Sequence, residues 1–222
     1  MSILGSTGKW SWVICFIGLC GFAAAVRGQA TASIALTNPP IVLTVEGSNV
    51  WVQRFRSTVS ESAYVNQILQ ARDRGRTGLR SRTSIRLSDL SVMRIGWQSE
   101  FEIQPLTDTK AESEFSLFRG LLYLLNRDRP GRHTFKTPTA TAATRGTEFT
   151  LEVENVTGRT ILTVLEGEAE LSNAAGSVQL VSGQQGIATL GQAPTSTAVI
   201  DTTNVIQWCL YYPGVLNLGD LN

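Results

Sequence analysis

The stretch Phe149-Thr150-Leu151-Glu152-Val153-Glu154 alternates strictly between apolar and polar side chains. Side chains along a β-strand point to opposite faces in turn, so Phe149, Leu151 and Val153 share one face of such a strand. The polar residues share the other face. The pattern therefore predicts a strand with one buried face and one solvated face.

Similar segments recur on both sides of this strand. From Ile41 onward, short runs rich in Val, Ile, Leu, Phe and Thr each end at Gly, Asn, Asp or Pro, which is typical of strands joined by turns. We expect further strands at residues 84–87, 92–95, 100–104, 114–118, 133–137, 161–165, 168–171, 177–181 and 184–189. No strict repeat period connects them. The sequence predicts an all-β fold, either a compact antiparallel sandwich or an irregular β-solenoid-like roll of short strands.

Two segments have a pattern that also fits a helix, residues 61–70 and 205–210. For the first, we expect a strand or an irregular lead-in to the arginine-rich stretch that follows it.

The first thirty residues have the layout of a secretory signal. Lys9 precedes an uncharged apolar run, Val13 to Val26, which is followed by small and polar residues. This run is shorter than the roughly 20 residues that a membrane-spanning helix needs. We expect residues 1–30 to be a signal peptide cleaved after Ala25 or Ala30, with an uncleaved membrane anchor as the alternative. The expected location is the periplasm or cell envelope.

Net charge and cysteine count indicate which partners are disfavoured and how the domain is stabilised. The chain has 19 Lys and Arg against 18 Asp and Glu, so no overall field favours nucleic acid as a partner. Cys15 and Cys20 lie in the signal, which leaves Cys209 alone in the mature chain and without an internal disulfide. We therefore expect the domain to be stabilised by packing. We expect it to contact the membrane only if the N-terminal segment stays attached.

The sequence does not predict an enzyme, a cofactor or a metal site. His133 is the only histidine, so the sequence lacks a two-histidine metal site, and it has no glycine-serine elbow or phosphate-binding glycine loop. A pair of carboxylates among Glu100, Glu102, Glu112 and Glu114 keeps a glycan hydrolase open as a third hypothesis. Their alternation with apolar residues favours the solvated face of a sheet.

Several short motifs, in order, resemble the FecR domain in its envelope-protein branch. They are Arg76-Thr77-Gly78, Ser81-Arg82, the run from Leu87 to Gly96, Thr137 to Ala142, Arg145-Gly146-Thr147-Glu148-Phe149, Val164-Leu165-Glu166-Gly167, Gly183-Gln184-Gln185 and Gln207 to Pro213. The resemblance covers roughly residues 41–221. It implies a FecR-type β domain over residues 31–204 and an aromatic C-terminal segment over 205–222, where related proteins often continue into helical repeats.

The resemblance implies an exported module that binds, supports or senses, with an envelope protein or wall polymer as partner. The alternative is a periplasmic regulator of transmembrane sigma-factor signalling. In the C-terminal segment, Trp208, Tyr211 and Tyr212 are candidate partner-binding residues, and closure of the core is the competing interpretation.

Arginines are the other candidate binding residues. A local cluster, Arg72, Arg74, Arg76, Arg80, Arg82 and Arg86, would suit an acidic polymer or would be a charged strand edge. Arg145 would either hold a carboxylate or pair with Glu148 or Glu166.

The remaining motif residues are predicted to be structural: Gly78, Asp89, Ser91, Pro138, Gly146, Thr147, Phe149, Gly167 and Gly183. Gly146 suits a bend with φ above zero. Asp89 and Ser91 suit a tight turn. Many FecR domains carry glycine between these two residues, so Leu90 predicts a turn without a left-handed residue.

Overall fold

Strands make up the regular structure of the computed structural model, which describes residues 39–105, 113–125 and 131–198. The strands are β1 (Ile41–Glu46), β2 (Val50–Gln53), β3 (Ser60–Ser62), β4 (Arg74–Thr77), β5 (Arg82–Arg86), β6 (Val92–Ile95), β7 (Glu100–Gln104), β8 (Ser113–Leu125), β9 (Arg132–Lys136), β10 (Thr141–Val153), β11 (Thr160–Asn173), β12 (Gly176–Val181), β13 (Gln184–Ala188) and β14 (Thr195–Ala198). The all-β prediction is confirmed.

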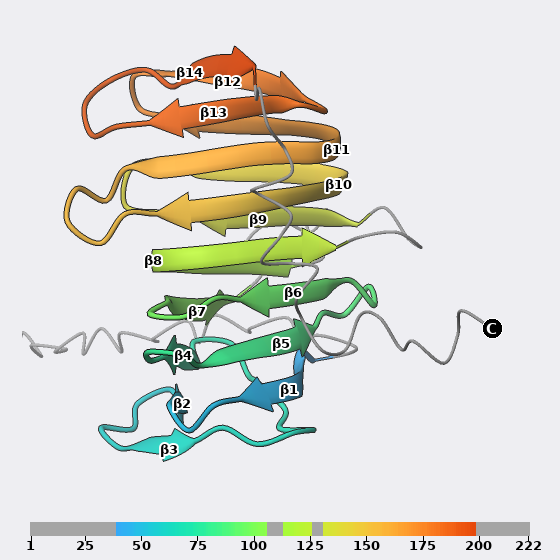
Figure 1. Ribbon diagram of the computed structural model, residues 1–222, viewed down its shortest axis with the longest axis vertical. Helices are drawn as coiled ribbons and strands as arrows, with labels where there is room; N and C mark the ends of the chain where they lie inside the picture. Colours follow the sequence, from blue (N-terminus) through green and yellow to red (C-terminus); the bar gives the residue numbers. More distant parts are fainter. Residues whose placement is uncertain (1–38, 106–112, 126–130, 199–222) are drawn as a thin grey trace, which may run out of the picture. The chain divides into compact units, whose positions relative to one another are not determined.

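One hydrogen-bonded sheet of 14 strands folds into two layers. The first layer has the order β3-β2-β4-β7-β8-β9-β10-β11-β12, and the second has the order β1-β5-β6-β8-β10-β11-β13-β14. In Figure 1 the strands lie one above another, from β3 at the bottom to β14 at the top. All pairs are antiparallel except β8–β9. Both layers contain β8, β10 and β11, because each half of these long strands pairs in a different layer.

A glycine lies at the bend of each long strand. Gly120 in β8, Gly146 in β10 and Gly167 in β11 have φ values of 93°, 61° and 89°. L-residues with side chains rarely adopt such angles, so glycine allows each strand to pass from one layer to the other. The expected bend at Gly146 is confirmed. Residues 161–165 and 168–171, predicted as two strands, are instead the two halves of β11 on either side of Gly167.

Hydroxyl side chains satisfy backbone groups at the corners between layers. Thr77 Oγ1 donates to the Gly96 carbonyl at 2.6 Å, and the Ser99 N–H donates to Thr77 Oγ1 at 2.9 Å. Ser99 Oγ in turn accepts from the Leu121 N–H at 3.0 Å. These bonds replace ladder hydrogen bonds that the corners interrupt.

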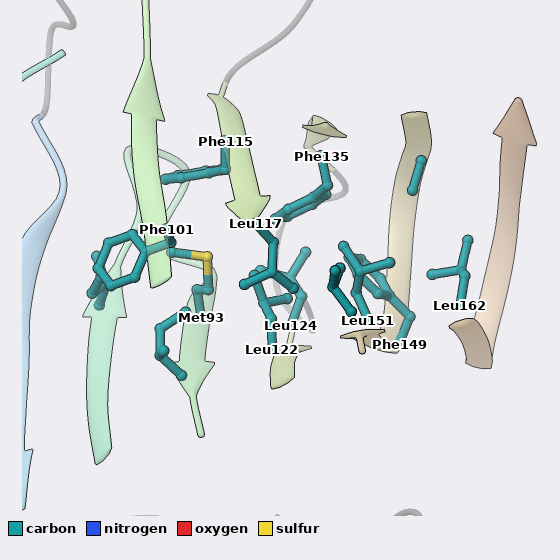
Figure 2. Packing of buried hydrophobic residues seen from close by; sticks show 14 of the residues in the cluster. Met93, Phe101, Phe115, Leu117, Leu122, Leu124, Phe135, Phe149, Leu151 and Leu162 are labelled. Atoms are coloured by element: carbon teal, nitrogen blue, oxygen red, sulfur yellow. The ribbon is translucent and has the colours of Figure 1, made fainter. Parts of the chain in front are cut away.

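Apolar side chains from the two layers fill the space between them (Figure 2). Phe135 stacks on Phe115 at 5.6 Å between ring centroids and meets the edge of Phe149 at 5.2 Å. Leu151 and Val153, on the same face of β10 as Phe149, are also buried. The face predicted from the alternating stretch is therefore the buried one.

The turn between β5 and β6 differs from the prediction. Leu90 has a φ of 72°, so the turn does contain a left-handed residue although the residue is not glycine. The Leu87 N–H donates to the Ser91 carbonyl at 2.9 Å, and Asp89 Oδ1 accepts from the Ser91 N–H at 3.1 Å. These bonds fix the turn geometry and outweigh the local strain of about 1–2 kcal/mol.

We expect Leu90→Gly to stabilise the domain. The substitution relieves the strain at this angle, and Leu90 is 54% exposed, so little packing is lost. The greater freedom of glycine in the unfolded chain offsets part of the gain, which leaves about 0.5–1 kcal/mol. Thermal unfolding followed by circular dichroism should show a higher midpoint. A lower midpoint would contradict the claim that Leu90 is strained in this turn.

Between β3 and β4 the chain is irregular, with one isolated bridge between Ile41 and Ile68. An irregular lead-in, one of the two forms expected there, is confirmed. In the part of the chain that the structure covers, no helix has the length and apolar character to cross a membrane. The predicted signal (1–30), the segment 205–210 and the C-terminal aromatic residues lie outside the described residues.

Candidate functional site

The arginines of the predicted cluster have different neighbours in the structure. Arg74 and Arg76 extend from β4 to carboxylates of β7. Arg74 lies 3.1 Å from Glu102 and 3.5 Å from Glu100, and Arg76 lies 3.2 Å from Glu100. Arg119 reaches Glu100 at 3.3 Å. Both cluster members are therefore held in ion pairs, in a network of three arginines and two carboxylates.

The other cluster members lie apart from this network. Arg72 lies over the Phe55 ring at 4.9 Å. Arg80 is exposed at the corner before β5 with a φ of 52°. Arg82 is half-buried in β5, and Arg86 is exposed at the end of that strand. The cluster is therefore not a single basic surface.

A polar hollow lies on the outer face of the first layer, over β9 to β12. One cross-strand row places Arg132, Arg145 and Glu168 side by side, and the next row places Thr134, Ala143, Glu170 and Gln179 side by side. Ala143 is short and its neighbours are long, so a hollow of about 280 Å³ forms above it. This is the candidate binding site.

The hollow has a basic half and an acidic half. Arg132 and Arg145 are directly opposed on β9 and β10, an arrangement that is unfavourable for like charges. Among the described residues, no ion pair neutralises either arginine. The predicted pairing of Arg145 with Glu148 or Glu166 is wrong: the Tyr123 hydroxyl donates to Glu148, and the strand register places Glu168 opposite Arg145.

Guanidinium groups on one side and carboxylates on the other give the hollow a defined chemistry. An arginine fork binds a carboxylate through two hydrogen bonds, and Glu168 and Glu170 on β11 can accept from a cationic or N–H group. The arrangement suits a partner surface that carries both charges.

A buried polar cluster links the layers. His133 Nε2 in β9 lies 3.0 Å from Asp89 Oδ2 in the β5–β6 turn, with side-chain exposures of 1% and 3%. Ser91 Oγ donates to the same carboxylate at 2.6 Å. Burial raises the pKa of Asp89, but hydrogen bonds from His133 and Ser91 outweigh it, and the net pKa is lowered.

This cluster does not have the arrangement of a catalytic triad. Ser91 bonds the carboxylate of Asp89, whereas a nucleophilic serine would bond the imidazole of His133. All three side chains are buried. The turn bonds expected of Asp89 and Ser91 are present, and they position the carboxylate for His133.

The acidic residues considered for hydrolysis also have structural partners. Glu100 and Glu102 belong to the arginine network, and Glu114 lies 3.4 Å from Lys136. Glu112 lies outside the described residues. Within residues 39–105, 113–125 and 131–198, no group of three or more His, Cys, Asp or Glu could hold a metal ion.

The other motif residues lie at turns, bends or in the core. Gly158 approaches Pro138, an exposed residue of the β9–β10 turn, and Thr139 Oγ1 donates to the Gly158 carbonyl at 3.0 Å. Thr147 Oγ1 donates to the Glu168 carbonyl at 2.7 Å. Gly183 lies in the turn before β13 with a φ of 80°.

Most residues of the hollow were not candidates from the sequence. Arg132, Ala143, Glu168, Glu170 and Gln179 each occupy an outward position of an alternating strand. That alternation was visible, but which outward residues are neighbours depends on strand register.

The comparisons with known proteins agree with this fold. The family model described as FecR protein matches residues 73–170. No curated protein matches the chain. Crystal structures of a candidate anti-sigma factor from Parabacteroides distasonis, at 1.65 Å and 2.50 Å resolution, superpose with a TM-score of 0.53 at 14% identity. Each alignment covers 61% of this chain, and 64% and 63% of those chains, so the match spans less than two thirds of their length.

At 14% identity, the similarity to these solved structures shows a shared fold only. The family match covers the region from β4 to the second half of β11, and it includes every residue of the hollow except Gln179. Residues 73–170 of this chain are therefore similar to the FecR protein family.

Proposed function

We propose that this protein is an exported, periplasmic regulator of transmembrane sigma-factor signalling, and that its β domain binds a protein partner. The FecR match and the fold shared with a candidate anti-sigma factor support this role. The proposal favours regulation over a purely structural envelope module.

The observation that carries the proposal is the hollow around Ala143. Arg132 and Arg145 are exposed, directly opposed and without ion pairs among the described residues, whereas Arg74 and Arg76 on the same face are held in ion pairs. Two directly opposed cations that are not held in ion pairs repel each other in the free protein, and a partner carboxylate between them would relieve the repulsion.

The nature of the partner follows from the charges. A uniformly anionic wall polymer would meet Glu168 and Glu170 as well as the arginines, and these acidic residues would repel it. A protein surface can place an acidic residue over Arg145 and a basic residue over the glutamates. We therefore propose an envelope protein as partner.

The proposed location is the periplasmic side of the envelope. It is supported by the N-terminal sequence, in which Lys9 precedes the apolar run from Val13 to Val26. Catalysis is not part of the proposal, because Glu100, Glu102 and Glu114 are held in ion pairs and Ser91 does not bond His133.

A deletion strain tests the regulatory role. Removing the gene should change a small set of transcripts that share a promoter sequence, and the wild-type gene supplied in trans should restore them. An unchanged transcript profile, together with an envelope defect that the wild-type gene corrects, would contradict regulation and support a structural module.

A further inference from the structure

The segment 55–68, which contains β3 and the turns on either side of it, exposes five large apolar side chains at the end of the strand order. These are Phe55, Val59, Tyr64, Val65 and Ile68, which are 45%, 70%, 58%, 51% and 50% exposed. They are five of the eleven large hydrophobic residues that are exposed in the described part of the chain. We call this surface the apolar end. Exposed apolar residues gathered in this way mark an interaction surface.

Hydrogen bonds hold the two segments of the apolar end together. Arg54 Nη1 donates to the Ile68 carbonyl at 2.9 Å and to Asp73 Oδ2 at 2.7 Å. Asp73 Oδ1 accepts from the Phe55 N–H at 3.1 Å. Phe55 and Ile68 are thus tied through Arg54 and Asp73, so the apolar side chains are presented by a braced surface.

Two arginines that form no ion pair with any described residue border the apolar end. The guanidinium groups of Arg56 and Arg72 lie 5.1 Å and 4.9 Å from the Phe55 ring centroid. Their φ values are 64° and 70°, in the left-handed region that residues with a side chain rarely adopt. Arg54, by contrast, is paired with Asp73 and Glu61. Strained, exposed cations beside an apolar surface indicate a partner that is both anionic and apolar.

The apolar end also lies beside the strand through which the chain enters the sheet. The Leu69 N–H donates to the Pro40 carbonyl at 2.8 Å, and the Val42 N–H donates to the Gln67 carbonyl at 2.9 Å. Residues 27–40 alone separate this strand along the chain from the apolar run that ends at Val26. The end of the sheet nearest in sequence to the export segment is therefore the end that exposes apolar and cationic side chains.

We propose that the apolar end docks on an anionic lipid surface. Aliphatic and aromatic side chains enter the interface between headgroups and acyl chains, while Arg56 and Arg72 bind lipid phosphates from beside Phe55. An acidic peptide would satisfy the arginines but would leave the aliphatic side chains of Val59, Val65 and Ile68 without a matching surface. The inference goes beyond the signalling role and does not depend on it.

Site-specific fluorescence in the full chain tests this docking. Cys15, Cys20 and Cys209 are replaced by Ser, and an environment-sensitive dye is attached at Val65→Cys or, as the matched control, at Val181→Cys. Val181 is similarly exposed, at 48%, but lies on β12 at the other end of the strand order. Each protein is mixed with vesicles of phosphatidylcholine alone or of phosphatidylcholine with phosphatidylglycerol.

The proposal predicts a blue shift of the dye at position 65 with the anionic vesicles, and little shift at position 181 or with neutral vesicles. Arg56→Gln with Arg72→Gln should reduce that shift by at least half while the far-ultraviolet circular dichroism stays unchanged. Equal shifts at both positions, or a shift independent of anionic lipid and of the arginines, would overturn the proposal. A shift with soluble polyglutamate but none with vesicles would overturn it in favour of a protein partner.

Discussion

Gly120→Val should lower the free energy of unfolding by about 3–5 kcal/mol, enough to leave much of a small domain unfolded. Gly120 has a φ of 93°, and a Cβ there would lie 2.5 Å from the Ser99 Cα, in addition to overlapping Ser99 Oγ. Backbone strain and overpacking each contribute about 1–3 kcal/mol. Urea unfolding followed by circular dichroism measures the loss.

Gly183→Val is the matched control for Gly120→Val. Gly183 has a similar φ of 80°, but nothing lies within 4 Å of the position that a Cβ would take. This variant tests strain without a clash, and we expect a loss of about 1–2 kcal/mol. Equal losses for the two variants would show that close packing at the β8 bend contributes nothing.

We expect Asp89→Asn to lower the free energy of unfolding by about 2–4 kcal/mol at neutral pH. The Asp89 carboxylate accepts hydrogen bonds from Ser91 and lies 3.0 Å from His133 Nε2 in a buried site. An ionised carboxylate only accepts, so Nε2 donates to it, and an amide replaces this charge-assisted bond with a weaker one. Removing one member of a buried charged network is costly.

The pH dependence gives this prediction a second readout. Because the pKa of folded Asp89 is lowered, its contribution to stability is complete above the unfolded value of about 3.9 and is lost as the pH falls through the folded pKa. The difference between wild type and Asp89→Asn should therefore be largest at neutral pH and shrink below about pH 4. Glu152→Gln, at an exposed position of β10, is the control. A constant difference across this range would contradict the lowered pKa.

Local patterns in the sequence were sufficient to predict most strands. Alternation identified the buried face of Phe149, Leu151 and Val153, and β6 and β7 begin and end where the sequence predicted. The long strands were not predicted, because a glycine such as Gly167 can either end a strand or bend it. Which of these occurs depends on contacts with Gly146 and Thr147, which are distant in the sequence.

The candidate site was harder to predict than the fold. Arg145 was identified from a motif, but its neighbours Arg132 and Glu168 are set by the register of β9, β10 and β11. The Leu90 prediction was wrong because the preference of leucine against positive φ is weaker than the hydrogen bonds of its turn. The arginine cluster was predicted from the closeness of its members in the sequence. In the structure, Arg74 and Arg76 form ion pairs with carboxylates of β7.

The most direct test of the proposed role is the transcript profile of the deletion strain when it is complemented with Arg145→Ala. Arg86→Ala is the control, because Arg86 is exposed in β5, away from the hollow. If the hollow binds the signalling partner, Arg145→Ala should leave the profile of the deletion strain unrestored while the protein stays folded and abundant, and Arg86→Ala should restore the wild-type profile. Full restoration by Arg145→Ala would contradict the account.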